Sequence, residues 1–257
     1  MTCRELARKV LLLSAASLAV VATSVSAQIF NDIQSELRVM WIQMKRDTPR
    51  HPNPRVQQFT QCIAWAIIDV LPEEFQNLDW EVIVFDLPEK NAMVMPDGKI
   101  AVFSGILEVA NTADKLAAVL GHEVAHLTQG HVKERSIRMA GTGLLGLGGA
   151  ILGGGLVSGG EAQQGAQVIF QYPFQREQER EADFVGMEYM AKAGYNPAAV
   201  LELWRDMANA TQSRMPEFLS THPEPDLRRT GMAGNLSPSL VIYNQALDSG
   251  VRPRCRF

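Results

Sequence analysis

Gly121-His122-Glu123-Val124-Ala125-His126 is the stretch from which the fold and the chemistry of this chain can be inferred. On an α-helix, residues four apart lie on one face, so His122 and His126 can direct their ring nitrogens at one ion. Glu123 then stands beside that ion. This H-E-x-x-H arrangement is typical of zinc hydrolases, in which the histidines bind the metal and the glutamate acts as a general base. The motif therefore predicts a zinc site on a helix.

The residues around the motif predict that this helix enters the protein core. Residues 111–114 have the composition of a helix start, with a capping residue and an acidic residue three places on. Apolar residues then recur at helical spacing, at Leu116, Val119, Leu120, Val124 and Leu127. Such a stripe is expected to be buried.

His131 is a poor candidate for a third metal ligand. It comes five residues after His126, which places it about 140° around the helix if the helix persists. The longer H-E-x-x-H-x-x-G-x-x-H pattern requires a glycine at 129 and a histidine at 132, and the chain has Gln129 and His131 instead. This difference argues against the metzincin class.

A second predicted helix, at residues 174–193, offers better ligands and ends at Gly194. One face of this helix carries two acidic and two small residues, namely Glu179, Ala182, Asp183 and Gly186. The small residues permit another helix to approach closely, and the buried carboxylates then require a cation. Zinc is the expected cation.

Three short segments predict a small sheet. Residues 80–85, 92–95 and 99–103 are rich in β-branched and aromatic residues, and the last two segments flank a Pro-Asp-Gly turn. We expect these two to form a hairpin. An exposed edge of such a sheet beside the zinc helix could bind an extended peptide as an added strand, and a sheet that merely covers the helix is the alternative.

Composition limits the classes of protein and of partner. The chain has 257 residues, 46% hydrophobic and 20% charged, which is enough to bury a sizeable core in one catalytic domain. Its net charge is -4 and it contains no run of lysine or arginine. Nucleic acid is therefore excluded as an expected partner.

The N-terminus resembles a secretory signal peptide. Three basic residues precede an apolar run at 10–21, and small residues at 25–27 predict cleavage before Gln28. An uncleaved membrane anchor is the alternative, although the run is shorter than the roughly 20 residues that a spanning helix needs. Cys3 lies ahead of the apolar run, so the exported protein is not expected to be a lipoprotein.

Removal of the signal leaves Cys62 and Cys255 in an oxidising compartment. A disulfide between them would join the C-terminal tail to an early helix. Two unpaired thiols are the alternative, because the sequence does not supply the Cα separation.

Residues 140–160 contain ten glycines and no charged residue. Glycine at this density weakens a helix, so we expect a mobile element over or beside the site. A flexible loop without a role and a segment in peripheral contact with a membrane are the alternatives.

Taken together, the motifs resemble the M48 metallopeptidases, the family of Ste24, HtpX and Oma1. The resemblance covers about residues 91–228. It rests on residues 121–126, on Glu-Arg-Glu-Ala-Asp-Phe-Val-Gly at 179–186, and on Ser-Thr-His-Pro at 220–223 followed by Arg228. One departure is Gln175, where family members often have serine, which puts the start of that helix in question. The predicted signal is similar to that of the soluble periplasmic branch.

The resemblance implies an α+β, mainly α-helical fold of the zincin-like (gluzincin) type, with a small sheet beside the H-E-x-x-H helix. It implies one Zn²⁺ per chain, held by His122, His126 and Glu179, with Glu123 as the general base. Asp183 and Arg228 would support the metal ligands without binding the metal. The expected parts are a signal peptide at 1–27, a helix and linker at 28–55, the peptidase domain at 56–235 and a tail at 236–257.

His222 lies in a predicted turn at 219–223 that the resemblance places at the active site. Its imidazole could donate a hydrogen bond to the developing oxyanion, or it could bind the zinc and displace the catalytic water. The expected function is zinc-dependent endopeptidase cleavage of exported envelope proteins that are unfolded or misassembled. The alternative is a periplasmic chaperone or assembly factor that uses the same groove with little proteolysis.

Overall fold

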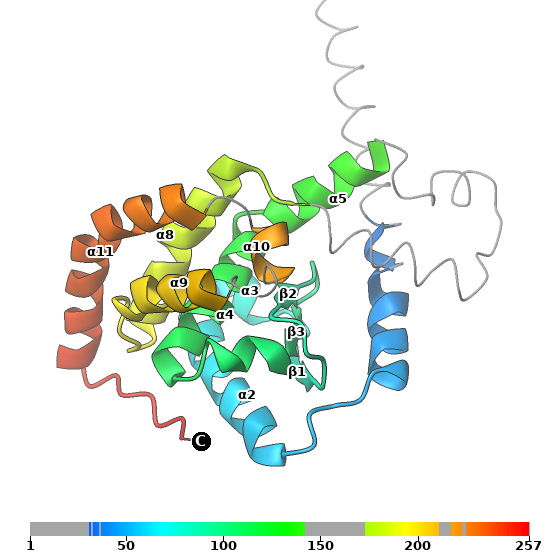
Figure 1. Ribbon diagram of the computed structural model, residues 1–257, viewed down its shortest axis with the longest axis horizontal. Helices are drawn as coiled ribbons and strands as arrows, with labels where there is room; N and C mark the ends of the chain where they lie inside the picture. Colours follow the sequence, from blue (N-terminus) through cyan, green and yellow to red (C-terminus); the bar gives the residue numbers. More distant parts are fainter. Residues whose placement is uncertain are drawn as a thin grey trace, which may run out of the picture.

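The computed structural model describes residues 31, 33–35, 37–141, 173–210, 217–222 and 225–256 (Figure 1). The elements in chain order are α2 (Pro54–Ile68), α3 (Glu73–Gln76), β1 (Glu81–Phe85), β2 (Ala92–Val94), β3 (Lys99–Phe103), the 3₁₀ helix η1 (Ser104–Glu108), α4 (Ala113–Thr128), α5 (His131–Gly141), α8 (Arg176–Lys192), α9 (Ala199–Ala210), α10 (Glu217–Thr221) and α11 (Pro225–Asp248). The fold is therefore mainly helical with one small sheet, and the predicted α+β class is confirmed.

Helix α4 forms the centre of the domain. It packs chiefly against α8, while the sheet lies on another side of it and α11 packs on the outside of α8 (Figure 1). The two central helices cross at Gly121 and Gly186, where a Cβ atom on Gly186 would lie 2.8 Å from the backbone nitrogen of His122. Only glycine permits this approach, so the small-residue face predicted for α8 is confirmed.

The sheet has the strand order β1-β3-β2. Strands β2 and β3 are antiparallel, with Met93 opposite Ala101, so the predicted hairpin is confirmed. Strand β1 runs parallel to β3, with Ile83 opposite Ala101. One face of the sheet joins the main core through residues such as Val84 and Val102, while Ile83 and Ala101 face a second cluster.

The second cluster is covered by a helix at the start of the described chain, where residues 37–47 are helical. Trp41 is buried in this cluster and donates a hydrogen bond of 2.6 Å from its indole nitrogen to Glu81 Oε2. Helix α2 follows after the proline-rich segment, with Asn53 as its capping residue.

The two edges of the sheet differ in their environment. The outer edge of β1 is covered, because His51 donates its backbone N–H to Val84 O and Gln57 bonds both Val82 O and Val84 N. On β2, the bonds from Phe103 N to Asn91 O and from Met95 N to Lys99 O fix the pairing with β3. The backbone polar groups of the intervening Ala92 and Val94 therefore face away from β3, toward the edge beside α4.

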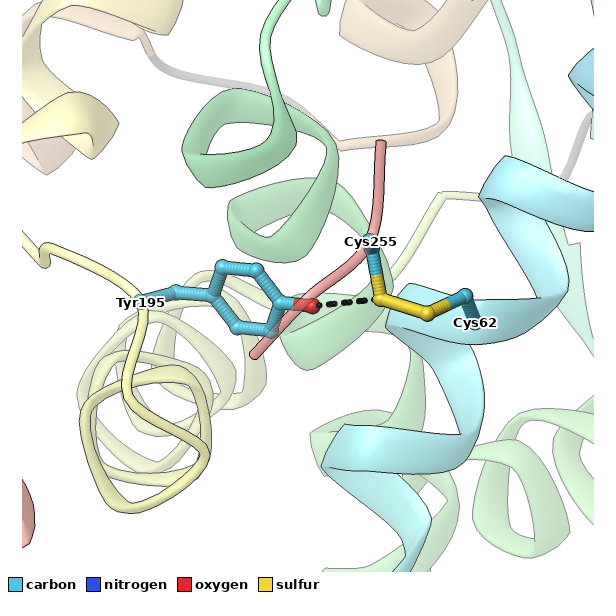
Figure 2. Close-up of a disulfide and its surroundings, with 3 residues drawn as sticks. All are labelled: Cys62, Tyr195 and Cys255. Carbon is cyan, nitrogen blue, oxygen red and sulfur yellow. Dashed lines mark hydrogen bonds between the residues drawn. A yellow bond between two sulfur atoms is a disulfide. The ribbon is translucent and has the colours of Figure 1, made fainter. Parts of the chain in front are cut away.

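A disulfide joins Cys62 of α2 to Cys255 of the C-terminal segment, with a Cα–Cα distance of 5.6 Å (Figure 2). The pairing that the sequence left open is therefore formed. Tyr195 donates a hydrogen bond of 3.3 Å from its hydroxyl to Cys255 Sγ (Figure 2).

One prediction about the C-terminal part was wrong. The turn expected at 219–223 is helical up to Thr221, where α10 ends. Helix α11 then runs through residue 235 to Asp248, although it contains Pro238 and two glycines that weaken the helical pattern in the sequence.

No helix in the described ranges is long and apolar enough to span a membrane. The predicted signal peptide at 1–27 lies outside the described residues, and so does almost all of the glycine-rich segment at 140–160.

Candidate metal centre

Helix α4 carries the first half of the site. Thr112 caps it by accepting a hydrogen bond from Lys115 N, which confirms the predicted start of the helix. In the second half of the helix, His122, Glu123 and His126 are buried with exposed fractions of 5%, 2% and 0%.

Helix α8 carries the second half of the site. Its first turn begins after Gln175, whose backbone N–H donates to Gln178 Oε1 at 3.1 Å. A capping interaction is thus present at the position where the sequence departs from the family pattern. Glu179 lies in that first turn and Asp183 one turn later, and both are buried against α4.

Four side chains converge on one point. His122, His126, Glu179 and His222 each offer a ligand atom, and these atoms all lie within 4.8 Å of one another. His122 Nε2 is 3.0 Å from His126 Nε2 and 3.5 Å from Glu179 Oε2. Two ligands bound at about 2.0–2.1 Å to a tetrahedral zinc are about 3.4 Å apart, so this spacing fits a zinc ion.

The carboxylates also fit a metal. Arg228 Nη1 lies 2.6 Å from Glu179 Oε2, but the contact lacks hydrogen-bond geometry, and this buried oxygen has no hydrogen-bond partner among the described residues. Glu123 Oε1 is likewise buried without a hydrogen bond. Burial alone raises the pKa of Glu179, but the electrostatic effects of His222 and Arg228 outweigh it and hold this pKa well below its usual value. An ionised carboxylate with a free oxygen is suited to bind a cation.

Asp183 and Arg228 support His122. Asp183 Oδ1 lies 3.1 Å from His122 Nδ1, which leaves Nε2 of the same ring directed at the cluster. Arg228 holds both oxygens of Asp183, through Nε at 2.8 Å and Nη2 at 2.5 Å. Burial lowers the pKa of His122, but the hydrogen bonds to Asp183 and Glu179 more than compensate and raise it to about 9. The carboxylate thus fixes the orientation and the tautomer of His122.

His131 has a role that the sequence analysis did not identify. Helix α4 ends at Thr128, and Gly130 adopts φ +77°, so His131 starts a new helix and lies behind His126. Its Nδ1 is 3.1 Å from Nδ1 of His126, and its Nε2 is 3.2 Å from Glu181 Oε2. His131 is thus placed outside the ligand cluster, where it orients His126. Burial lowers the pKa of His126 well below its usual value, which favours the neutral form that binds metals.

His222 is the fourth member of the cluster and is only 2% exposed. It follows α10, and its ring stacks on Phe218 at 4.3 Å. Its Nδ1 is 2.9 Å from Glu179 Oε1 and 3.1 Å from His122 Nε2, while its Nε2 is 3.3 Å from Glu123 Oε1. The imidazole therefore lies beside the three other ligand atoms, close enough to share a metal ion with them.

Two cavities flank the cluster. One cavity, of about 300 Å³, is mainly apolar and lies next to His122, between α4, α8 and α9. Its wall includes Val119, Met187 and Trp204. The other, of about 240 Å³, lies between Glu123 and strand β2 and also contacts Arg135 and His222.

A sequence model of peptidase family M48 matches residues 51–232, which include every residue of this site. The chain therefore belongs to peptidase family M48. It is 32% identical over 221 residues to the mitochondrial metalloendopeptidase OMA1 of Saccharomyces cerevisiae, covering 80% of this chain and 63% of that protein. It is 36% identical over 187 residues to the mitochondrial metalloendopeptidase OMA1 of Danio rerio, covering 68% and 38%.

The chain is also 26% identical over 224 residues to the beta-barrel assembly-enhancing protease of Yersinia pestis, covering 81% of this chain and 45% of that protein. It spans less than two thirds of the length of each of these relatives.

Proposed function

We propose that the protein is a zinc-dependent endopeptidase that cleaves exported proteins. One observation carries this proposal: His122, His126 and Glu179 form a buried donor set beside the unpaired carboxylate oxygen of Glu123. Three protein ligands and one open position characterise a catalytic zinc site, whereas a structural site has four protein ligands. The names of the relatives, metalloendopeptidase and protease, agree with this proposal.

The chain's own residues would then perform the following steps. A zinc ion held by His122, His126 and Glu179 would lower the pKa of a bound water and polarise the peptide carbonyl. Glu123, on the same turn of α4, would take the proton from that water and deliver it to the leaving amine. Asp183, which lies 3.1 Å from His122 Nδ1, would keep His122 in the tautomer whose Nε2 is free to bind the ion.

We also propose that His222 occupies the fourth ligand position at rest and leaves it when a substrate binds. The short distances from its Nδ1 to Glu179 and His122 support this assignment. In this arrangement His222 would exclude the catalytic water and keep basal activity low. Once displaced, its imidazole would remain near enough to donate to the oxyanion.

The substrates are proposed to be unfolded or misassembled envelope proteins in the periplasm, a location that rests on the predicted signal peptide. The 140–160 segment remains a proposed site of peripheral membrane contact. A second candidate, an assembly factor with little proteolysis, is favoured by one observation: His222 completes the ligand set and would suppress hydrolysis.

Hydrolysis of unfolded casein, with and without a chelator, separates these functions. We expect cleavage that the chelator abolishes and that added zinc restores, with about one zinc per chain by elemental analysis. Glu123→Gln should retain the zinc and lose hydrolysis, because its side chain acts as a base and not as a ligand. Full activity of this variant would refute the mechanism, whereas a zinc-loaded parent protein that cleaves nothing would favour the assembly factor.

A further inference from the structure

Arg135 of α5 is a buried cation that has no anionic or hydrogen-bonding partner among the described residues. Its exposed fraction is 5%, and in the described part of the chain its guanidinium makes no hydrogen bond and no ion pair. Its Nε in particular is fully buried without an acceptor. A guanidinium has five N–H donors, and burying them unpaired costs free energy that a bound acceptor would recover.

Stacking holds this guanidinium in place. Its Cζ lies 4.0 Å from the ring centroid of Phe174, and the same ring stacks on His126 at 3.7 Å with an angle of 20° between the planes. Two groups so close to one ring must lie on opposite faces of it. Stacking engages the flat face of a guanidinium and leaves the N–H donors in its plane free to bind. The side chain of Arg135 is thus fixed in position, while its Nε–H has no hydrogen-bond acceptor among the described residues.

The free donors of Arg135 border the site of the proposed reaction. Arg135 lines the cavity of about 240 Å³ together with Glu123 and His222. The opposite wall is formed by Ala92 and Met93 of β2, which pairs with β3 along one edge and, in the described part of the chain, with no strand along the other. A peptide that reached Glu123 along this edge would therefore pass in front of the guanidinium.

The charge of Arg135 persists in this environment. Burial lowers its pKa to about 10, while the nearby charges of Glu123 and Glu179 act in the opposite direction, so the side chain is a cation at neutral pH. No carboxylate of the described residues is close enough to form an ion pair with it, and Glu179 belongs to the candidate metal ligands. The guanidinium of Arg135 therefore presents a positive charge to a ligand in this cavity.

We propose that Arg135 binds a carboxylate of the substrate close to the scissile bond. The carboxylate belongs to an aspartate or glutamate side chain or to the C-terminus of a peptide. This inference rests on the proposed peptidase function and adds a substrate preference to it. A carboxylate is the ligand of choice because it accepts two parallel hydrogen bonds from a guanidinium, whereas a backbone carbonyl offers one uncharged acceptor.

Matched peptides test the proposal. Internally quenched peptides carry glutamate or glutamine at one position at a time, from three residues before to three residues after the scissile bond. Each peptide is made with a free and with an amidated C-terminus, which separates the two sources of the carboxylate. At one position, or at the free C-terminus, kcat/KM should be at least about tenfold higher for the acid than for its neutral counterpart.

Three variants assign the preference to Arg135. Arg135→Gln should reduce the acid-to-neutral ratio to about one, and Arg135→Lys should keep it above one because the charge remains. Arg138→Gln is the matched control, since it removes the same charge one turn later on α5 from a side chain that bonds Gln178 instead of lining the cavity. This control should keep the full ratio.

Binding of the same peptides to zinc-loaded Glu123→Gln protein, followed by fluorescence anisotropy, gives a readout that needs no hydrolysis. The acidic peptide should bind more tightly, and Arg135→Gln in this background should remove the difference. Equal binding of acidic and neutral peptides, or an Arg135→Gln effect that is the same for both, would overturn the role of Arg135. Absence of hydrolysis by the parent protein would overturn the proposed function alone, because the binding comparison would still decide the inference.

Discussion

Replacement of Gly186 by alanine tests the helix contact on which the metal site depends. The added Cβ would lie 2.8 Å from His122 N, 2.9 Å from Gly121 C and 3.0 Å from Gly121 O. These are all backbone atoms, so no side-chain rotation relieves the clash. Ordinary contacts begin at 3.4 Å, and the gap from 2.8 Å means that the helices must separate by about 0.6 Å.

The magnitude follows from two opposing effects. Alanine in place of glycine inside a helix gains about 1 kcal/mol, while overpacking a tight contact costs about 1–3 kcal/mol. Because only backbone movement can relieve this clash, we expect the upper part of that range and a net loss of about 1–2 kcal/mol. For a chain of this size the melting temperature should fall by about 2–8 °C.

The effect on the metal should be larger than the effect on stability. Zinc ligands tolerate shifts of about 0.2 Å, and a separation of about 0.6 Å moves Glu179 and Asp183 away from the histidines of α4. We expect zinc affinity, measured by competition with a chelating dye, to fall by about 10–100-fold, as when a group supporting a ligand is lost.

Gly234→Ala is the matched control, because its Cβ would meet no atom within 4 Å on the exposed face of α11. This variant should gain up to about 1 kcal/mol and keep its zinc affinity. If Gly186→Ala were as stable as Gly234→Ala and bound zinc equally well, the close approach of α4 and α8 would not be a feature of the folded protein.

Three further predictions concern single residues. Glu179→Ala should empty the zinc site, whereas Asp183→Ala should lower zinc affinity by only about 10–100-fold. If dye competition showed the weaker zinc binding in Asp183→Ala, the roles of the two carboxylates would be exchanged. His222→Ala should raise kcat/KM on a short unstructured peptide if this histidine blocks the fourth position. A loss of roughly 10²-fold would instead assign it to the oxyanion. Cys62→Ser removes a link between positions 193 residues apart and should cost about 2–4 kcal/mol, or about 4–16 °C in melting temperature. An unchanged melting temperature would show that the disulfide does not contribute to stability.

The parts of the site that depend on helical periodicity can be predicted from the amino-acid sequence alone. The spacing of His122 and His126 and the capped start of α4 are local properties, and the structure agrees with both. The small-residue face of α8 also identified Glu179, because a buried carboxylate needs a cation. The Cys62–Cys255 pairing could be suggested but not decided, since its geometry depends on how α2 and the C-terminal segment pack.

Which residues surround these ligands depends on how the elements pack. On a continuous helix His131 would lie about 140° around from His126, but the left-handed Gly130 ends α4 and brings His131 behind His126. Arg135 lies four residues later on the same new helix, and nothing in its local pattern distinguishes it from a solvated charge. The burial of His222 and Arg228 could not be predicted either, because it depends on where α10 and α11 pack against α4 and α8. Side-chain periodicity along one element does not show which other element covers it.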